Sequence, residues 1–170
     1  MATKMDLILA GPSGHVLAAG LRNDTSGSQP NAAALVGDAL AIRSATTGNT
    51  ILNVAAQHLS VQAVDLREDV LLTARDFVLV DGLPEKGLDP HTTPLSLSGG
   101  KITVTVPSNA QQDVPVWVYI EGAVQPVVQQ LTVPEAATSA EEILVLPGGP
   151  YRALVLAEGV MAAIVEITAT

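Results

Sequence analysis

Two neighbouring stretches in which apolar and polar residues alternate constrain the fold of this chain most strongly. Residues 101–106 read Lys-Ile-Thr-Val-Thr-Val, and residues 116–121 read Val-Trp-Val-Tyr-Ile-Glu. Successive side chains of a β-strand point to opposite faces, so this period of two predicts two half-buried strands. The polar segment 107–113 separates them. We therefore expect a hairpin-like strand pair at the centre of an all-β domain.

Short apolar runs bounded by glycine, proline and small polar residues continue this pattern along the chain. We expect about ten to twelve short strands, which predicts a β-sandwich or a jelly-roll-like barrel, with the jelly roll as the leading topology. The last two runs surround a turn at Glu158 and Gly159 and predict a hairpin. Besides the two stretches above, the expected strands cover residues 5–10, 15–21, 51–56, 59–65, 70–73 with 77–80, 95–98, 124–133, 143–146, 151–157 and 160–168.

A polar segment near the N-terminus predicts the domain organisation. Residues 22–31 are rich in turn-forming residues and are the best linker in the chain. We expect residues 1–31 to form an N-terminal arm or edge hairpin with a polar linker, and residues 32–170 to form the β-sandwich domain. Residues 32–45 are a helix candidate that Asn31 could cap. Because Gly37 interrupts this candidate and no helical stripe is present, we expect a strand-like or mixed segment.

Residues 81–94 and 134–142 are the expected long connections. The first contains two glycines and three prolines, and loops this long are often functional. It also offers ligands for a metal ion, but their spacing matches no calcium-binding pattern, which favours a solvated loop. The second is polar and acidic, which indicates a solvated connection. The candidate ligands in the first are Asp81, Glu85, Asp89 and His91.

Residues 11–14, Gly-Pro-Ser-Gly, follow an apolar run and resemble the opening of a phosphate-binding loop. Such a loop needs a lysine for the phosphates and a serine or threonine for magnesium. Here His15, Val16 and Leu17 follow instead. The sequence therefore favours a plain turn.

The remaining candidate groups do not form a catalytic or metal-binding pattern. His15, His58 and His91 lie far apart and lack the spacing of zinc ligands. The chain has no cysteine, which rules out disulfides and thiolate sites. We therefore predict no catalytic, cofactor-binding or metal-binding residues, and no enzymatic activity.

Charge and composition exclude further classes of function. The net charge is −9, with only eight lysines and arginines, which disfavours binding to nucleic-acid backbones and to anionic membranes. No window holds the ~18 apolar residues of a membrane helix, and no signal peptide is evident. We expect a chain made in the cytoplasm. Charged residues make up only 15% of it and the mean hydropathy is +0.37, which fits equally a subunit that hides surface against its neighbours and a chain whose 24 alanines raise the mean hydropathy.

Trp117 and Tyr119 are the candidate interface residues. The chain has only four aromatic residues, and these two share one face of an expected strand. Aromatic side chains with a polar tip are favoured at protein interfaces. We therefore predict that this pair forms a contact surface.

In overall character the whole chain resembles a bacteriophage virion structural protein of the capsid-decoration (cement) type. The resemblance rests on the all-β pattern, the aliphatic composition, the low charge and the expected N-terminal arm. It implies a protein of the virion that decorates or stabilises a phage capsid by subunit–subunit contacts. The implied partners are copies of itself, in a homo-oligomer such as a trimer, and a major capsid or other virion protein, without direct contact to nucleic acid.

Two alternative functions stay open on the sequence. The first is a β-sandwich module that binds a carbohydrate or a peptide, for which Trp117, Tyr119 and Tyr151 would supply the aromatic surface. The second, ranked last, is a cupin-like enzyme, because the three histidines lack the spacing that such a site requires.

Overall fold

A computed structural model describes residues 4–11, 13–22, 28–43, 50–122 and 125–170 of the chain. The protein is mostly β, with 56% of its residues in strands and 11% in helices, which confirms the all-β prediction. The described residues form fourteen short strands, more than the ten to twelve expected. The chain divides into two compact units, Met1–Gly87 and Leu88–Thr170, which are described separately below.

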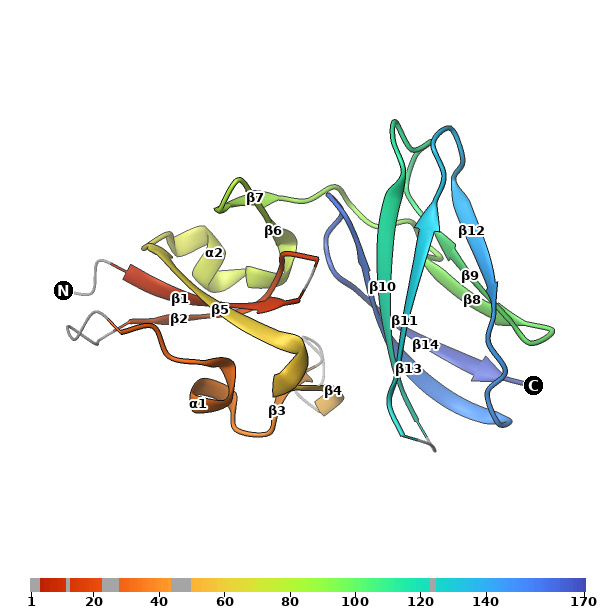
Figure 1. The fold of residues 1–170 in the computed structure, drawn as a ribbon, viewed down its shortest axis with the longest axis horizontal. Coiled ribbons are helices and arrows are strands. Elements are labelled where there is room, and N and C mark those ends of the chain that lie inside the picture. Colours follow the sequence, from red (N-terminus) through yellow and green to blue (C-terminus); the bar gives the residue numbers. More distant parts are fainter. Residues whose placement is uncertain (1–3, 12, 23–27, 44–49, 123–124) are drawn as a thin grey trace. The chain divides into compact units, whose positions relative to one another are not determined.

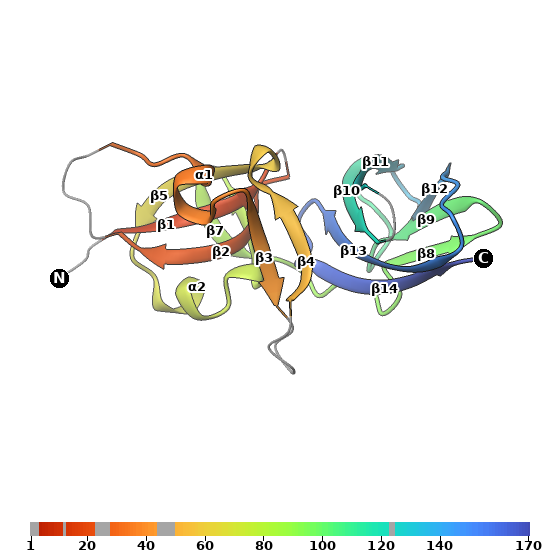
Figure 2. The same ribbon diagram turned by 90° about the horizontal axis from the view of Figure 1, so that it is seen from below.

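The first unit is built on a five-stranded antiparallel sheet with the order β5-β1-β2-β6-β7 (Figure 1). Two further strands form a separate hairpin, which Figure 2 shows as β3 beside β4. The sheet strands are β1 (Lys4–Ala10), β2 (His15–Leu21), β5 (Leu59–Asp65), β6 (Phe77–Val80) and β7 (Leu83–Lys86). The other elements are β3 (Ala39–Arg43), β4 (Thr50–Ala55), the helices α1 (Ala32–Val36) and α2 (Glu68–Leu72), and the 3₁₀ turns η1 (Ala56–His58) and η2 (Ala74–Asp76).

The N-terminal strands belong to this sheet, and the unit boundary falls after Gly87 rather than at residue 31. Strand β1 pairs with β2 on one side and with β5 on the other. All its residues after Lys4 are buried, because both faces of a central strand are covered. The nearly continuous apolar run of residues 7–10 is typical of such a strand, whereas an edge hairpin would alternate.

Two short helices lie in segments for which the sequence indicated, in the first, a strand-like or mixed structure and, in the second, a strand. Asn31 caps α1 by accepting a hydrogen bond from the Ala34 amide at 2.8 Å, and Gly37 ends the helix with a φ of 70°. Residues 39–43 then form a strand, so the segment 32–45 is mixed where it is described. The expected strand over 70–73 is wrong, because α2 spans Glu68–Leu72 and buries Val70. A run of four residues is too short for its apolar pattern to distinguish a helix from a strand.

The expected loop 81–94 contains an unpredicted strand. Residues 83–86 form β7, which pairs with β6 through a two-residue turn. Asp81 and Gly82 have φ angles of 50° and 79°, the left-handed pair that a type I′ hairpin turn requires. An Asp-Gly pair is the strongest short hairpin signal in a sequence, and it was available here.

The second unit is a sandwich of two antiparallel sheets (Figure 1). One sheet has the order β11-β10-β13-β14 and the other the order β12-β9-β8. Apolar side chains from both sheets form one core. The strands are β8 (Leu95–Ser98), β9 (Lys101–Thr105), β10 (Val114–Glu121), β11 (Val127–Val133), β12 (Ser139–Ile143), β13 (Gly149–Ala157) and β14 (Ala163–Ala169). The expected hairpin at Glu158 and Gly159 is present between β13 and β14.

The predicted hairpin between the two alternating stretches is wrong. Strand β9 pairs with β8 and β12, whereas β10 pairs with β11 and β13, so the two strands lie in different sheets. Ile102 of β9 and Val118 of β10 are both fully buried in the shared core. A strand alternates in the same way whether its neighbour along the chain pairs with it or faces it across a core, so the pattern could not separate the two arrangements.

The strand order of the second unit is that of an immunoglobulin-like sandwich, rather than the eight-stranded jelly roll. Seven strands divide three and four between the sheets. Near the start of the sixth strand, the Tyr151 hydroxyl donates a hydrogen bond to the Pro147 carbonyl at 2.8 Å. This contact is the tyrosine corner of such sandwiches, which fastens a strand to the loop before it. Tyr151 is only 2% exposed.

Candidate functional site

The most exposed large apolar side chains of the described chain lie together, at the end of β12 and just after it. Ile143 and Val145 are each 76% exposed. Leu144 and Leu146 alternate with them and pack against the core. We call residues 139–145 the β12 edge. The sequence placed a polar connection over 134–142 and a strand over 143–146, whereas the strand spans Ser139–Ile143.

The backbone of the β12 edge has one side available for a further strand. Among the described strands, β12 pairs with β9 alone. The Val106 amide donates to the Thr138 carbonyl, and the Leu144 amide donates to the Gly100 carbonyl, each at 2.9 Å. In an antiparallel pair, alternate residues point their amide and carbonyl groups toward the neighbour. The groups of the odd-numbered residues, 139 to 145, therefore point away from β9.

A small cavity lies beside the C-terminal end of the β12 edge. Its volume is about 120 Å³, below the 300–1,000 Å³ typical of small-molecule pockets. Such a space suits one apolar side chain of a partner better than a separate ligand. Residues 97–100, 144–146 and 169–170 line it.

The predicted interface pair lies on one face of β10, but its two members differ in exposure. Tyr119 is only 7% exposed, and Trp117 is partly buried. Their register partners on β13, Leu154 and Leu156, are fully buried. Trp117 is therefore the member of the pair whose side chain is partly exposed and can contact a partner. The contact role of the pair stays a prediction.

Burial raises the pKa of the Tyr119 phenol above its ordinary value of 10.0. The folded state then keeps its proton at a pH where the unfolded chain has lost it. The contribution of Tyr119 to stability is complete below pH 10 and falls as the pH rises toward the folded-state pKa. We expect Tyr119→Phe to lose less stability than the parent above pH 10. Urea denaturation from pH 7 to 11 measures this, and parallel curves for the two proteins would contradict it.

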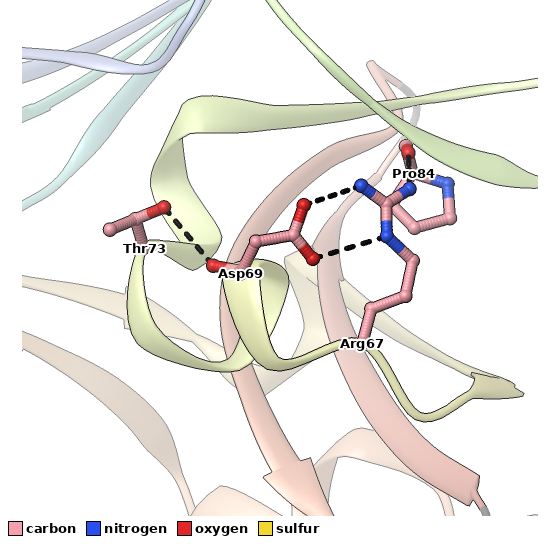
Figure 3. Close-up of polar contacts among 4 residues, drawn as sticks. All are labelled: Arg67, Asp69, Thr73 and Pro84. Carbon is pink, nitrogen blue, oxygen red and sulfur yellow. Dashed lines mark hydrogen bonds and ion pairs between the residues drawn. The ribbon is translucent and has the colours of Figure 1, made fainter.

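One polar cluster of the first unit is a structural clamp around Arg67 (Figure 3). Arg67 Nη2 and Nε bond the two carboxylate oxygens of Asp69 at 2.6 and 3.2 Å, and Nη1 donates to the Pro84 carbonyl at 2.6 Å. The guanidinium carbon lies 5.4 Å from the ring centre of Phe77. The Arg67 hydrogen bond is the main cause that lowers the pKa of Asp69. With its donors engaged, Arg67 fastens α2 to β7 and is poorly placed to bind a ligand.

The other candidate groups from the sequence do not gather into a site. In the described residues, no three histidine, aspartate or glutamate side chains come close enough to hold a metal ion. Asp81 and Glu85 belong to the first unit, whereas Asp89 and His91 belong to the second.

The segment 11–14 is the turn that the sequence favoured, as far as it is described. Pro12 lies outside the described residues, and β2 rather than a helix follows the turn. Neither described α-helix exceeds five residues, so none can span a membrane.

No protein-family model matches this chain, and no curated protein matches it.

Sequence reasoning missed Ile143 and Val145 as surface residues. A signal was available in residues 141–148, Glu-Glu-Ile-Leu-Val-Leu-Pro-Gly. Two acidic residues and a proline bound this short apolar run, which suits a strand at the margin of a sheet better than a central one.

Proposed function

We propose that this chain is a structural virion protein that decorates or stabilises a phage capsid by subunit–subunit contacts. Its partners in this role are further copies of itself and a major capsid or other virion protein. The virion is its place of action.

One observation carries the proposal: the β12 edge combines backbone groups that no described strand pairs with and two aliphatic side chains that are each 76% exposed. Burying apolar surface releases about 25 cal/mol per Å², which favours a protein contact at this place. The outward amide and carbonyl groups would orient such a contact, because a strand of the partner can form main-chain hydrogen bonds with them and so extend the sheet. The net charge of −9 suits an outward position, away from packaged nucleic acid.

The ligand-binding alternative receives less support. A sugar-binding surface needs exposed aromatic rings, and Trp117, Tyr119 and Tyr151 were the candidates. Tyr119 is 7% exposed and Tyr151 only 2%. Tyr151 is also occupied by its bond to Pro147.

Particle association tests the proposed function. Particles from a lysate of the phage that encodes the chain are separated on a density gradient, and the chain is quantified in each fraction by mass spectrometry. We expect it in the particle fractions, at a copy number comparable to that of a capsid protein.

Absence of the chain from purified particles would refute the virion role. A strictly monomeric chain that binds a soluble sugar would instead favour the ligand-binding alternative.

A further inference from the structure

We propose that two copies of this chain pair through their β12 edges, antiparallel about a two-fold axis at Ile143, and so form one continuous sheet. This pairing adds detail to the proposed structural role. That two copies would pair in this way within a virion rests on the proposed function. It names the partner, a second copy, and the residues that meet.

The first argument is the shape and chemistry of the edge. The five residues of β12 span about 17 Å in extended conformation, the length of a typical strand. Natural edge strands are protected from pairing by charged side chains, especially lysine, by proline or by a bulge, and of these devices residues 139–145 hold only the carboxylates of Glu141 and Glu142. The outward positions hold serine, glutamate, isoleucine and valine, and proline first appears at residue 147. This edge is thus suited to receive another strand.

The second argument is the register, which like charges restrict. An axis at Glu141 or at Glu142 would place that carboxylate opposite its own copy, which is unfavourable. An axis at Leu144 would place Pro147, which has no amide hydrogen, opposite Glu141. Axes nearer the N-terminus would leave Ile143 and Val145 without a partner strand.

An axis at Ile143 keeps each glutamate away from its own copy and moves Pro147 to the end of the edge, opposite Ser139 of the second copy rather than opposite Glu141. Ile143 then faces Ile143 of the second copy, and Glu141 faces Val145 of that copy. Odd-numbered residues meet odd-numbered residues, so the outward amide and carbonyl groups of both edges bond one another. The contact is the same on both copies, which closes the pair without further growth.

The third argument is the charge beside this contact. Glu141 already has partners within its own sheet: Lys101 Nζ at 3.5 Å and the Thr103 hydroxyl at 3.5 Å. Lys101 therefore offsets the charge of Glu141, whereas Glu142 has no ion pair among the described residues. The net charge of −9 on each copy still repels at longer range. Salt screens such repulsion, so we expect the pair to strengthen as salt is added.

Disulfide cross-linking tests the register directly. The chain has no cysteine, so a single introduced cysteine can bridge only two copies. Facing Cα atoms in a bonded antiparallel pair are about 5.5 Å apart, within disulfide range. We expect Ile143→Cys to form a dimer quickly under mild oxidation. Val145→Cys should do so slowly, because its counterpart on the second copy lies four residues along the strand. Leu72→Cys, equally exposed in the first unit, is the control.

Sedimentation measures the strength of the pair without cross-linking. Ile143→Lys places two positive charges face to face and should weaken the dimer about tenfold or more. Val145→Lys places its charge opposite Glu141 of the second copy, and we expect a smaller loss. Leu72→Lys should leave association unchanged. Far-ultraviolet circular dichroism of each variant checks that it is folded.

A chain that stays monomeric at high concentration and high salt would overturn the inference, and so would a trimer. Equal cross-linking of Ile143→Cys and Val145→Cys would overturn the register. These results differ from those that test the virion role. A dimer that does not bind particles refutes that role alone, and a particle-bound monomer refutes this pairing alone.

Discussion

We expect Gly122→Ala to destabilise the second unit by about 3 kcal/mol, the upper end of the usual cost of overpacking. A Cβ atom at Gly122 would lie 2.2 Å from Cδ1 and 2.7 Å from Cε1 of the Tyr151 ring. The ring cannot easily move aside, because it is buried and its hydroxyl is bonded to Pro147. Trp117, the only tryptophan, lies in the same unit, so its fluorescence during urea denaturation reports the change.

Two further variants separate this clash from a general effect of adding a methyl group. Gly148→Ala is the matched control, because the nearest atom to its new Cβ would be the Ala169 carbonyl oxygen at 3.8 Å. It should change stability by less than about 0.5 kcal/mol. Tyr151→Ala removes the ring, at a cost of about 3–5 kcal/mol by itself. Adding Gly122→Ala to that variant should then cost almost nothing, and additive losses would contradict the proposed clash.

We expect Asp6→Ala to destabilise the first unit by about 3–5 kcal/mol, the usual cost of leaving one member of a buried ion pair alone. Asp6 Oδ1 lies 3.1 Å from Arg22 Nη1, and the two side chains are only 11% and 9% exposed. Arg22 also donates to the Ser28 carbonyl, which keeps its guanidinium in place after the substitution. Hydrogen exchange of peptides from β1, followed by mass spectrometry, measures the local loss of stability.

The pair of Lys4 with Asp65 provides the control for the same strand. Their charged atoms are 2.6 Å apart, closer than those of Asp6 and Arg22, but the side chains are 54% and 86% exposed. Solvent screening makes such a pair worth less than about 1 kcal/mol. Asp65→Ala should therefore barely change exchange in β1. If Asp6→Ala and Asp65→Ala increased exchange in β1 equally, burial of the Asp6–Arg22 pair would not explain the loss of stability. Replacing Asp6 and Arg22 together by apolar residues should recover much of the loss.

Much of the local structure could be predicted from residue patterns. The period of two predicted β9 and β10 as strands, although burial of Tyr119 covers much of the second face of β10 as well, and the turn at Glu158 and Gly159 predicted the last hairpin. The apolar run of residues 7–10 also contained the sign of a central strand, although its place near the N-terminus suggested an arm. The Asp81-Gly82 pair also indicates a hairpin turn in the sequence.

The candidate surface was less accessible to sequence reasoning. The aromatic residues Trp117 and Tyr119 drew attention because the chain has so few. Side-chain type does not show how much area a residue keeps exposed, and Tyr119 keeps little. Ile143 and Val145 look like core residues in the sequence. They are exposed because alternate residues of the same run, Leu144 and Leu146, already face the core.

Residue patterns predict short strands around an aliphatic interior, because side-chain period and turn chemistry act between near neighbours. Which of these strands pair with one another follows from the tertiary structure alone. Strands β9 and β10 follow each other along the chain yet lie in opposite sheets, and β12 is left at an edge with its outer side unpaired among the described strands. Pairing depends on contacts between residues far apart in the chain, and these leave no trace in the local period of any one strand.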